Sequence, residues 1–348
     1  DPDHSLVGSE MCIRDSCKTA RTNHPQHSSC VLCWFAFPAP SINVAPHKRH
    51  LTWDPTRPDL HESEPSLKKE PRMDVRPRRS VLYMPGSNDR ALEKAKTIPA
   101  DALILDLEDA VAPDAKTEAR EKVCAAVKAG GYGKRELIIR VNALETPWGA
   151  DDLKAASQAG PDAILVPKVG RPGDIISAAK VVTAADAPDK TMLWAMMETP
   201  MSILNVREIA MAGIEREHRL TCLVMGTNDL IKESHARAYE DRFAVVPWLS
   251  MTIVAARAYG LDVLDGVYNE FRDMEGLRRE CEHGRTLGMD GKTLIHPAQV
   301  EITNEIFSPS EDEVTWSRKI IAAFKQPENA ARGVITVDGK MVERLHLQ

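Results

Sequence analysis

Short apolar runs recur along the chain from Arg78 onward, and segments with a helical pattern separate them. The runs are continuous rather than alternating, which is typical of parallel strands covered on both faces. One intervening segment, residues 114–131, ends on a Gly pair that suits a helix C-terminus. The eight runs are SVLYM at 80–84, ALILDL at 102–107, ELIIRV at 136–141, AILVP at 163–167, MLWAMM at 192–197, TCLVMG at 221–226, LDVLDGV at 261–267 and KTLIHP at 292–297.

Eight strand–helix units in succession predict an α/β fold of the (β/α)8 TIM-barrel type. A doubly wound open sheet is the alternative. No Gly-rich dinucleotide fingerprint follows the first run, since YMPGSND does not match one. A closed barrel also leaves no exposed strand edges, which eight apolar runs would otherwise present. We therefore expect residues 73–308 to form a TIM-barrel domain.

The pattern changes after residue 308. Residues 309–348 predict a C-terminal extension made of one helix and one hairpin. Ser310 is the expected N-cap of the helix, with Glu313 three residues later as in a capping box. The hairpin is expected to turn at DGK, residues 338–340.

The first 72 residues differ in kind from the rest. They hold six of the eleven His and nine of the 23 Pro and show no sustained apolar period, so residues 1–72 are interpreted as a disordered or adventitious segment before Met73. Cys30 and Cys33 form a C-x-x-C pair, but no second pair stands at zinc-site spacing. The apolar patch CVLCWFAF at 30–37 lacks the flanks of a secretory signal.

Charge and composition exclude several classes of partner. The net charge of −6 comes from interspersed charges of both signs, so neither a nucleic-acid stripe nor a membrane patch is expected. No apolar run is long enough to span a bilayer. Beyond the first 72 residues the cysteines are isolated among apolar neighbours (Cys124, Cys222 and Cys281), which predicts buried thiols and a cytoplasmic location.

Every predicted strand ends in polar or charged residues. In a TIM barrel the C-terminal ends of the strands form the functional face, so these side chains are expected at one mouth. Charges placed only for solubility would be spread over both ends of the barrel. The strand-end residues are PGSNDR at 85–90, Glu108 and Asp109, Arg140 and Asn142, Lys168, Glu198, Asn228 and Asp229, Asp265 and Asn269, and His296.

The strand-end acids predict a divalent-metal site. Carboxylates converge only where positive charge offsets their repulsion. The donors are all oxygens, which favours Mg²⁺, with Mn²⁺ as a possibility, over zinc. Glu198 and Asp229, on adjacent strands, are the predicted metal ligands. Glu108 and Asp109, together with Lys168, are expected around that ion, where the two acids hold its water ligands.

Simpler interpretations exist for single residues at this face. Asp109 could serve only the dipole of the next helix, Lys168 could be a surface lysine, and His296 could be a turn residue. Arg140 is different, because an arginine that ends a buried run needs an anionic partner.

Successive motifs resemble those of the citrate lyase β-subunit-like (HpcH/HpaI aldolase/citrate lyase) superfamily. The likeness runs from about residue 78 to 345 and is closest to the malyl-CoA, β-methylmalyl-CoA and citramalyl-CoA lyases. It implies a TIM barrel that acts on CoA esters, forms a homotrimer or homohexamer, and uses magnesium. The motifs are RSVLYMPGSNDRALEKA, DALILDLEDAVAPDAK, RVNALETPWGADDL, ILVPKV, METP, MGTNDL, DGVYNEFRD and GKTLIHPAQV.

The resemblance also implies roles for individual residues. Arg140 matches an arginine that binds substrate oxygens, and Asn88 stands where the family often has a CoA-binding arginine. Glu343, in GKMVE, stands where an Asp acid/base delivered by a neighbouring subunit is common. The predicted catalytic residues are thus Arg140 and Glu343. The predicted substrate and CoA-binding residues are Tyr83, Asn88, Lys94, Arg140, Glu198, Asn228, Ile295 and His296.

The expected activity is a magnesium-dependent, reversible cleavage of a malyl-CoA-like 3-hydroxyacyl-CoA to a 2-oxoacid such as glyoxylate and an acyl-CoA. Two alternatives stay open. One is hydrolysis of the malyl-CoA thioester on the same barrel, and the other is a non-catalytic CoA-ester binding protein. The sequence leaves the identity of the acyl group undetermined.

Overall fold

A computed structural model describes residues 76–237, 241–329 and 331–347. The chain divides into two units, Asp1–Glu70 and Pro71–Gln348, and the fold described below belongs to the second. The predicted disordered or adventitious segment, 1–72, lies outside the described residues.

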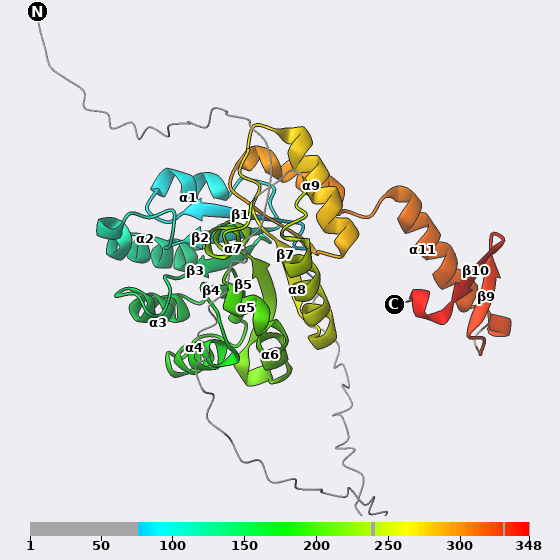
Figure 1. The fold of residues 1–348 in the computed structure, drawn as a ribbon, viewed down its shortest axis with the longest axis horizontal. Helices are drawn as coiled ribbons and strands as arrows, with labels where there is room; N and C mark the ends of the chain where they lie inside the picture. Colours follow the sequence, from blue (N-terminus) through cyan, green and yellow to red (C-terminus); the bar gives the residue numbers. More distant parts are fainter. Residues whose placement is uncertain (1–75, 238–240, 330, 348) are drawn as a thin grey trace, which may run out of the picture. The chain divides into compact units, whose positions relative to one another are not determined.

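Eight parallel strands close into a barrel in which each strand pairs with the next and β8 pairs with β1 (Figure 1). The predicted (β/α)8 fold is therefore confirmed, and the open doubly wound alternative is wrong. Several strands end one to three residues earlier than predicted. The strands are β1 Ser80–Pro85, β2 Ala102–Asp106, β3 Glu136–Arg140, β4 Ala163–Val166, β5 Met192–Met197, β6 Leu220–Met225, β7 Asp262–Asp265 and β8 Gly291–Leu294.

Helices lie between the strands and around the barrel, as Figure 1 shows. Their apolar faces pack on the outward-facing strand residues, which form the largest hydrophobic cluster. Among the described residues, no helix is both long and apolar enough to cross a membrane. The helices are α1 Asp89–Ala95, α2 Lys116–Ala129, α3 Gly149–Ala159, α4 Pro172–Ala184, α5 Pro200–Leu204, α6 Val206–Met211, α7 Thr227–Ser234, α8 Val246–Tyr259, α9 Met274–Leu287, α10 Val300–Phe307 and α11 Glu311–Phe324.

A second apolar cluster contains the inward-facing residues of the strands, among them Ile104, Ile138 and Trp194. Side chains alternate between the two faces of a strand, so residues two positions further on point the same way. Asp106 follows Ile104 and Arg140 follows Ile138 in this inward series, at the C-terminal ends of β2 and β3. The apolar filling of the barrel thus gives way to charged groups at its mouth.

The C-terminal extension contains the predicted helix and hairpin. Ser310 caps α11 and forms a capping box with Glu313. The antiparallel strands β9 Val334–Val337 and β10 Lys340–Glu343 turn at Asp338 and Gly339, both with positive φ. The extension has a small hydrophobic cluster of its own, made of Ile320, Phe324, Ile335, Val337 and Val342.

Candidate active site

Arg140 is the last residue of β3 and is bound at two points by Asp106. Arg140 Nε donates to Asp106 Oδ1 at 2.6 Å, and Nη2 donates to Oδ2 at 2.7 Å. The two residues are partners in the register of β2 and β3, which places them side by side. Both are buried, with Asp106 1% exposed and Arg140 5% exposed. The expectation that Arg140 needs an anionic partner is therefore met by Asp106.

The remaining guanidinium edge of Arg140 faces the other predicted acids. Arg140 Nη1 lies 2.8 Å from Glu108 Oε2 and 3.3 Å from Asp109 Oδ2. The Tyr83 ring stacks against the guanidinium at 4.8 Å, and the Met196 Sδ atom lies 3.9 Å from Nη1. Because Asp106 holds Nε and Nη2, a ligand in the mouth would reach Arg140 at Nη1, in place of Glu108 or Asp109.

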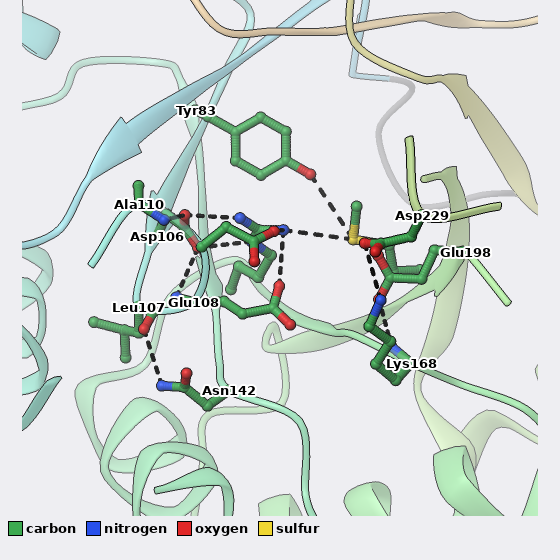
Figure 2. A network of polar contacts seen from close by, with 12 residues as sticks. Tyr83, Asp106, Leu107, Glu108, Ala110, Asn142, Lys168, Glu198 and Asp229 are labelled. Atoms are coloured by element: carbon green, nitrogen blue, oxygen red, sulfur yellow. Dashed lines mark hydrogen bonds and ion pairs between the residues drawn. The ribbon is translucent and has the colours of Figure 1, made fainter. Parts of the chain in front are cut away.

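Backbone amides fix Asp106 in turn, as Figure 2 shows. Its Oδ1 accepts from the N–H of Glu108 at 2.9 Å and its Oδ2 accepts from that of Ala110 at 3.0 Å. Asn142 Nδ2 donates to the Leu107 carbonyl at 2.9 Å and so ties the same turn to the loop after β3. The turn that follows β2 is thus locked around the carboxylate that orients Arg140.

The predicted metal ligands meet around Lys168 (Figure 2). Lys168 Nζ lies 2.9 Å from Asp229 Oδ2 and 3.8 Å from Glu198 Oε1, and the Lys168 backbone N–H donates to Glu198 Oε1 at 2.7 Å. Glu198 follows β5 and is 1% exposed, whereas Asp229 lies in the first turn of α7 after β6. The two carboxylates therefore share one small region at the ends of adjacent strands.

Gly226, between β6 and α7, makes room for Glu198. A Cβ atom at this position would lie 2.4 Å from Glu198 Cβ and 2.9 Å from Glu198 Oε2, closer than real Cβ contacts allow. The glycine of the MGTNDL motif is thus required for the buried carboxylate of β5 to stand against the end of β6.

Burial raises the pKa of both inner glutamates. The pKa of Glu108 rises to about 8, because desolvation and the neighbouring acids outweigh Arg140. The pKa of Glu198 rises to about 7 through burial, against the opposing effect of Lys168. Lys168 keeps its charge: burial lowers its pKa, but the hydrogen bond to Asp229 and the charge of Glu198 raise it further.

This donor set fits a divalent ion. Asp106, Glu108, Glu198 and Asp229 place four carboxyl groups around the positive charges of Arg140 and Lys168. A bound cation would stabilise the charged form of Glu198 and so lower the pKa that burial has raised. Within the described ranges, no three His, Cys, Asp or Glu side chains gather as a metal cage. Two protein carboxylates with the other positions left to water and substrate are what Mg²⁺ prefers. Glu198 and Asp229 as its ligands stay a prediction.

The predicted CoA-binding residues of the first motif lie on α1. Asn88 is the N-cap of this helix, and its Oδ1 accepts from the Ala91 N–H at 3.1 Å. Lys94 is exposed in the last turn. Neither is tied to the Arg140 cluster, so their CoA contacts stay a prediction.

Three other predicted residues follow β6 and β8: Asn228 in the first turn of α7, and Ile295 and His296 directly after β8. Asn228 exchanges hydrogen bonds with Asn269 at 3.2 and 2.9 Å, and both border a cavity of about 410 Å³ beside α7. His296 stacks on Phe271 with ring centroids 4.9 Å apart, and its Nδ1 accepts from a backbone N–H. Ile295 is 41% exposed and is available for an apolar ligand contact.

Glu343 lies in the C-terminal extension, on β10, and is exposed. Its backbone N–H donates to His346 Nδ1 at 3.0 Å. Its carboxylate joins none of the described clusters around Arg140 and Lys168. A catalytic role for Glu343, delivered by another subunit as the resemblance implies, stays a prediction.

Sequence analysis missed Asp106 and Met196 as site residues. Asp106 falls inside the predicted run 102–107 and Met196 inside the predicted run 192–197, so both count there as strand interior. Period-two counting could have found both, since Asp106 continues the inward series of Ile104, and Met196 continues that of Trp194.

Comparisons with known proteins agree with this geometry. The HpcH/HpaI aldolase/citrate lyase family model matches residues 79–297. A (3S)-malyl-CoA thioesterase of Cereibacter sphaeroides is 52% identical over 271 residues, which cover 78% of this chain and 91% of that protein. An L-malyl-CoA/β-methylmalyl-CoA lyase of the same species is 33% identical over 80% of this chain and 94% of that protein.

Among solved structures, CitE of Mycobacterium tuberculosis in complex with magnesium, acetoacetate and coenzyme A superposes with a TM-score of 0.61. It is 26% identical, and the match covers 77% of this chain and 93% of that one. The closed barrel, the strand-end acids and the family match lead to one conclusion. The chain belongs to the HpcH/HpaI aldolase/citrate lyase family.

Proposed function

We propose that this protein hydrolyses the thioester of a malyl-CoA-like substrate in a magnesium-dependent reaction. The observation that carries metal-dependent chemistry on a CoA ester is that the Glu198–Lys168–Asp229 cluster and the Arg140 cluster both stand at the C-terminal ends of the barrel strands. The 52% likeness to (3S)-malyl-CoA thioesterases supports hydrolysis, which the sequence had left as the alternative to carbon–carbon cleavage.

A bound Mg²⁺ would supply Lewis-acid polarisation of substrate oxygens, and Glu198 and Asp229 would hold it. Arg140 presents Nη1 to a substrate oxygen on which negative charge develops, while Asp106 fixes the direction of the guanidinium. Tyr83 covers one face of Arg140 and keeps water from it. Glu343 of a second subunit would accept the proton of the attacking water.

Support for an oligomer comes from the extension. Its exposed large apolar side chains include Met341 at 75%, Leu345 at 62% and Val334 at 48%. Exposed apolar side chains grouped on one small element suit a contact with another chain. We propose that the extension packs on a neighbouring subunit of a homotrimer or homohexamer and carries Glu343 to its barrel.

A reversible lyase is the second candidate function. It is favoured by the 33% likeness to the L-malyl-CoA/β-methylmalyl-CoA lyase and the 32% likeness to the citrate lyase β subunit of Escherichia coli. Both reactions use the same metal ligands and the same arginine, so site geometry alone leaves both available.

Product analysis separates the candidates. Purified protein is incubated with malyl-CoA, β-methylmalyl-CoA or citramalyl-CoA and Mg²⁺, with and without EDTA. Hydrolysis gives free CoA and the intact hydroxy acid, whereas lysis of malyl-CoA gives glyoxylate and acetyl-CoA. We expect free CoA and malate, and no turnover in EDTA. Glyoxylate as the main product would establish the lyase, and no turnover of any of the three esters would favour a non-catalytic CoA-ester binding protein.

A further inference from the structure

Lys168 occupies the position between the two proposed metal ligands. Its ammonium lies 2.9 Å from Asp229 Oδ2, 3.8 Å from Glu198 Oε1 and 4.0 Å from Glu233 Oε1. Its backbone N–H binds the same Glu198 oxygen. One residue thus contacts both carboxylates, through its main chain and through its side chain.

The backbone of Lys168 is in an unfavourable conformation. Its φ is 53°, in the left-handed region that residues with a Cβ atom seldom adopt. Such conformations persist only where surrounding contacts hold them, and they concentrate at functional sites. In this conformation the N–H of Lys168 reaches Glu198, and its ammonium reaches Asp229 and Glu198. The strained backbone of Lys168 is thus tied to its contacts with the two carboxylates.

A lysine at this position affects a metal ion in two opposing ways. Its charge reduces the repulsion between Glu198 and Asp229 and keeps their oxygens together. The same charge competes for those oxygens, because a second cation would stand close to the ammonium. A surface lysine, the simpler interpretation from the sequence, would do neither.

We propose that Lys168 is a resident cation of the metal site, which assembles Glu198 and Asp229 without metal and weakens the binding of a divalent ion to them. The inference rests on the proposed metal pair. Lys168 acts as a positioning residue for the ligands, and its ammonium must leave the Asp229 oxygen when an ion takes that oxygen.

Mn²⁺ binding to the full-length protein tests the proposal, read by electron paramagnetic resonance of free Mn²⁺ without substrate. Lys168→Met keeps the side-chain length and removes the charge. We expect its Mn²⁺ dissociation constant to fall about tenfold, equivalent to about 1.4 kcal/mol. In EDTA the variant should have a lower Tm than wild type, and saturating Mn²⁺ should raise its Tm by more. Equal or weaker Mn²⁺ binding by Lys168→Met overturns the proposal.

Two further variants isolate the contact. Lys232→Met removes the same charge from an exposed position on α7, and we expect wild-type affinity. Lys168→Arg keeps the charge and should also bind Mn²⁺ as wild type does. Tighter binding by either variant would show that the effect does not come from the ammonium at this position.

Asp229→Asn distinguishes failure of this inference from failure of the proposed function. Loss of a ligand carboxylate should abolish measurable Mn²⁺ binding. If Asp229→Asn binds Mn²⁺ as wild type does, the metal pair itself is wrong. If Asp229→Asn loses Mn²⁺ binding but the Lys168 variants do not behave as expected, Glu198 and Asp229 remain the proposed metal ligands and the proposed role of Lys168 is wrong.

Discussion

Asp106 and Arg140 form a two-point ion pair between neighbouring strands of the barrel, with both side chains buried. The pair uses two of the three guanidinium nitrogens and fixes the direction of the third. The acid is itself held by two backbone amides. A single carboxylate thus determines where the proposed substrate-binding arginine points.

Replacement of Asp106 by Asn tests this relationship. The variant keeps the side-chain shape but loses the charge and one acceptor oxygen, so Arg140 loses its fixed orientation. We expect kcat to fall by roughly 10–100-fold, as for other residues that orient an active-site group. Removal of one partner of a buried pair should also destabilise the fold by about 3 kcal/mol or more.

Asp265→Asn is the matched control for this variant. Asp265 makes a comparable two-point pair with Arg242, at 2.9 and 2.5 Å, and is equally buried. Because Asp265 Oδ2 also lies 3.3 Å from the buried Lys292 Nζ, Asp265→Asn should lose at least as much stability in urea unfolding as Asp106→Asn, and it should retain far more of its kcat. Equal losses of kcat in both variants would reduce Asp106 to a stability role.

Loss of Arg140 itself should be more severe. Arg140→Ala removes the fixed positive charge that faces the developing oxyanion, and we expect a decrease in kcat of roughly 10²–10³-fold. Far-UV circular dichroism should confirm that the barrel is folded, because the variant leaves three carboxylates without their arginine. Normal malyl-CoA turnover by folded Arg140→Ala protein would contradict the assignment.

Gly226→Ala should damage the metal site through sterics alone. The added methyl group would lie 2.4 Å from Glu198 Cβ, so the Glu198 side chain or the end of β6 must move. We expect Mn²⁺ binding to weaken about tenfold or more, by analogy with loss of groups that orient metal ligands. Gly173→Ala, in α4, is the control, since nothing lies within 4 Å of its added Cβ.

The raised pKa of Glu108 predicts a pH dependence of stability. Its pKa is about 8 in the folded protein against 4.5 ordinarily, so between these values the folded state holds a proton that the unfolded state has released. The stability from this proton is complete below pH 4.5 and is lost as the pH rises through 8. Glu198, with a pKa of about 7, acts in the same direction.

Thermal unfolding in EDTA measures this effect. The Tm of the wild type should fall as the pH rises from about 5 to about 9, by roughly 2–4 °C for each kcal/mol lost. Glu108→Gln, whose side chain stays neutral, should show a smaller fall in Tm over this pH range. The control Glu121→Gln, at an exposed position, should show the same fall as the wild type. If the Tm of Glu108→Gln falls with pH as steeply as the Tm of the wild type, Glu108 does not carry this proton.

Delivery of Glu343 by another subunit can be tested by complementation. Arg140→Ala and Glu343→Ala proteins should each be nearly inactive. Mixed oligomers should regain activity, because a barrel with Arg140 can receive Glu343 from the other chain. Glu343→Ala should unfold at the wild-type temperature, since its side chain is exposed. No activity above that of the separate variants would place Glu343 in its own barrel or outside catalysis.

The sequence by itself determined the order of strands and helices and the location of the polar residues. Eight continuous apolar runs indicated parallel strands covered on both faces. Closure of the barrel leaves none of these strands with an exposed edge. The capping box at Ser310 and the turn at Asp338–Gly339 were local signals, readable because neighbouring residues along the chain satisfy them.

Only the tertiary structure decided which charges meet. The pairing of Asp106 with Arg140 depends on the register between β2 and β3, which no stretch of sequence specifies alone. Likewise, Lys168 reaches Glu198 and Asp229 through a left-handed backbone that the sequence did not predict. Strand propensity and apolar period come from neighbours along the chain, whereas the partners of a buried charge come from strands far apart in sequence. Closure of the barrel brings those strands together.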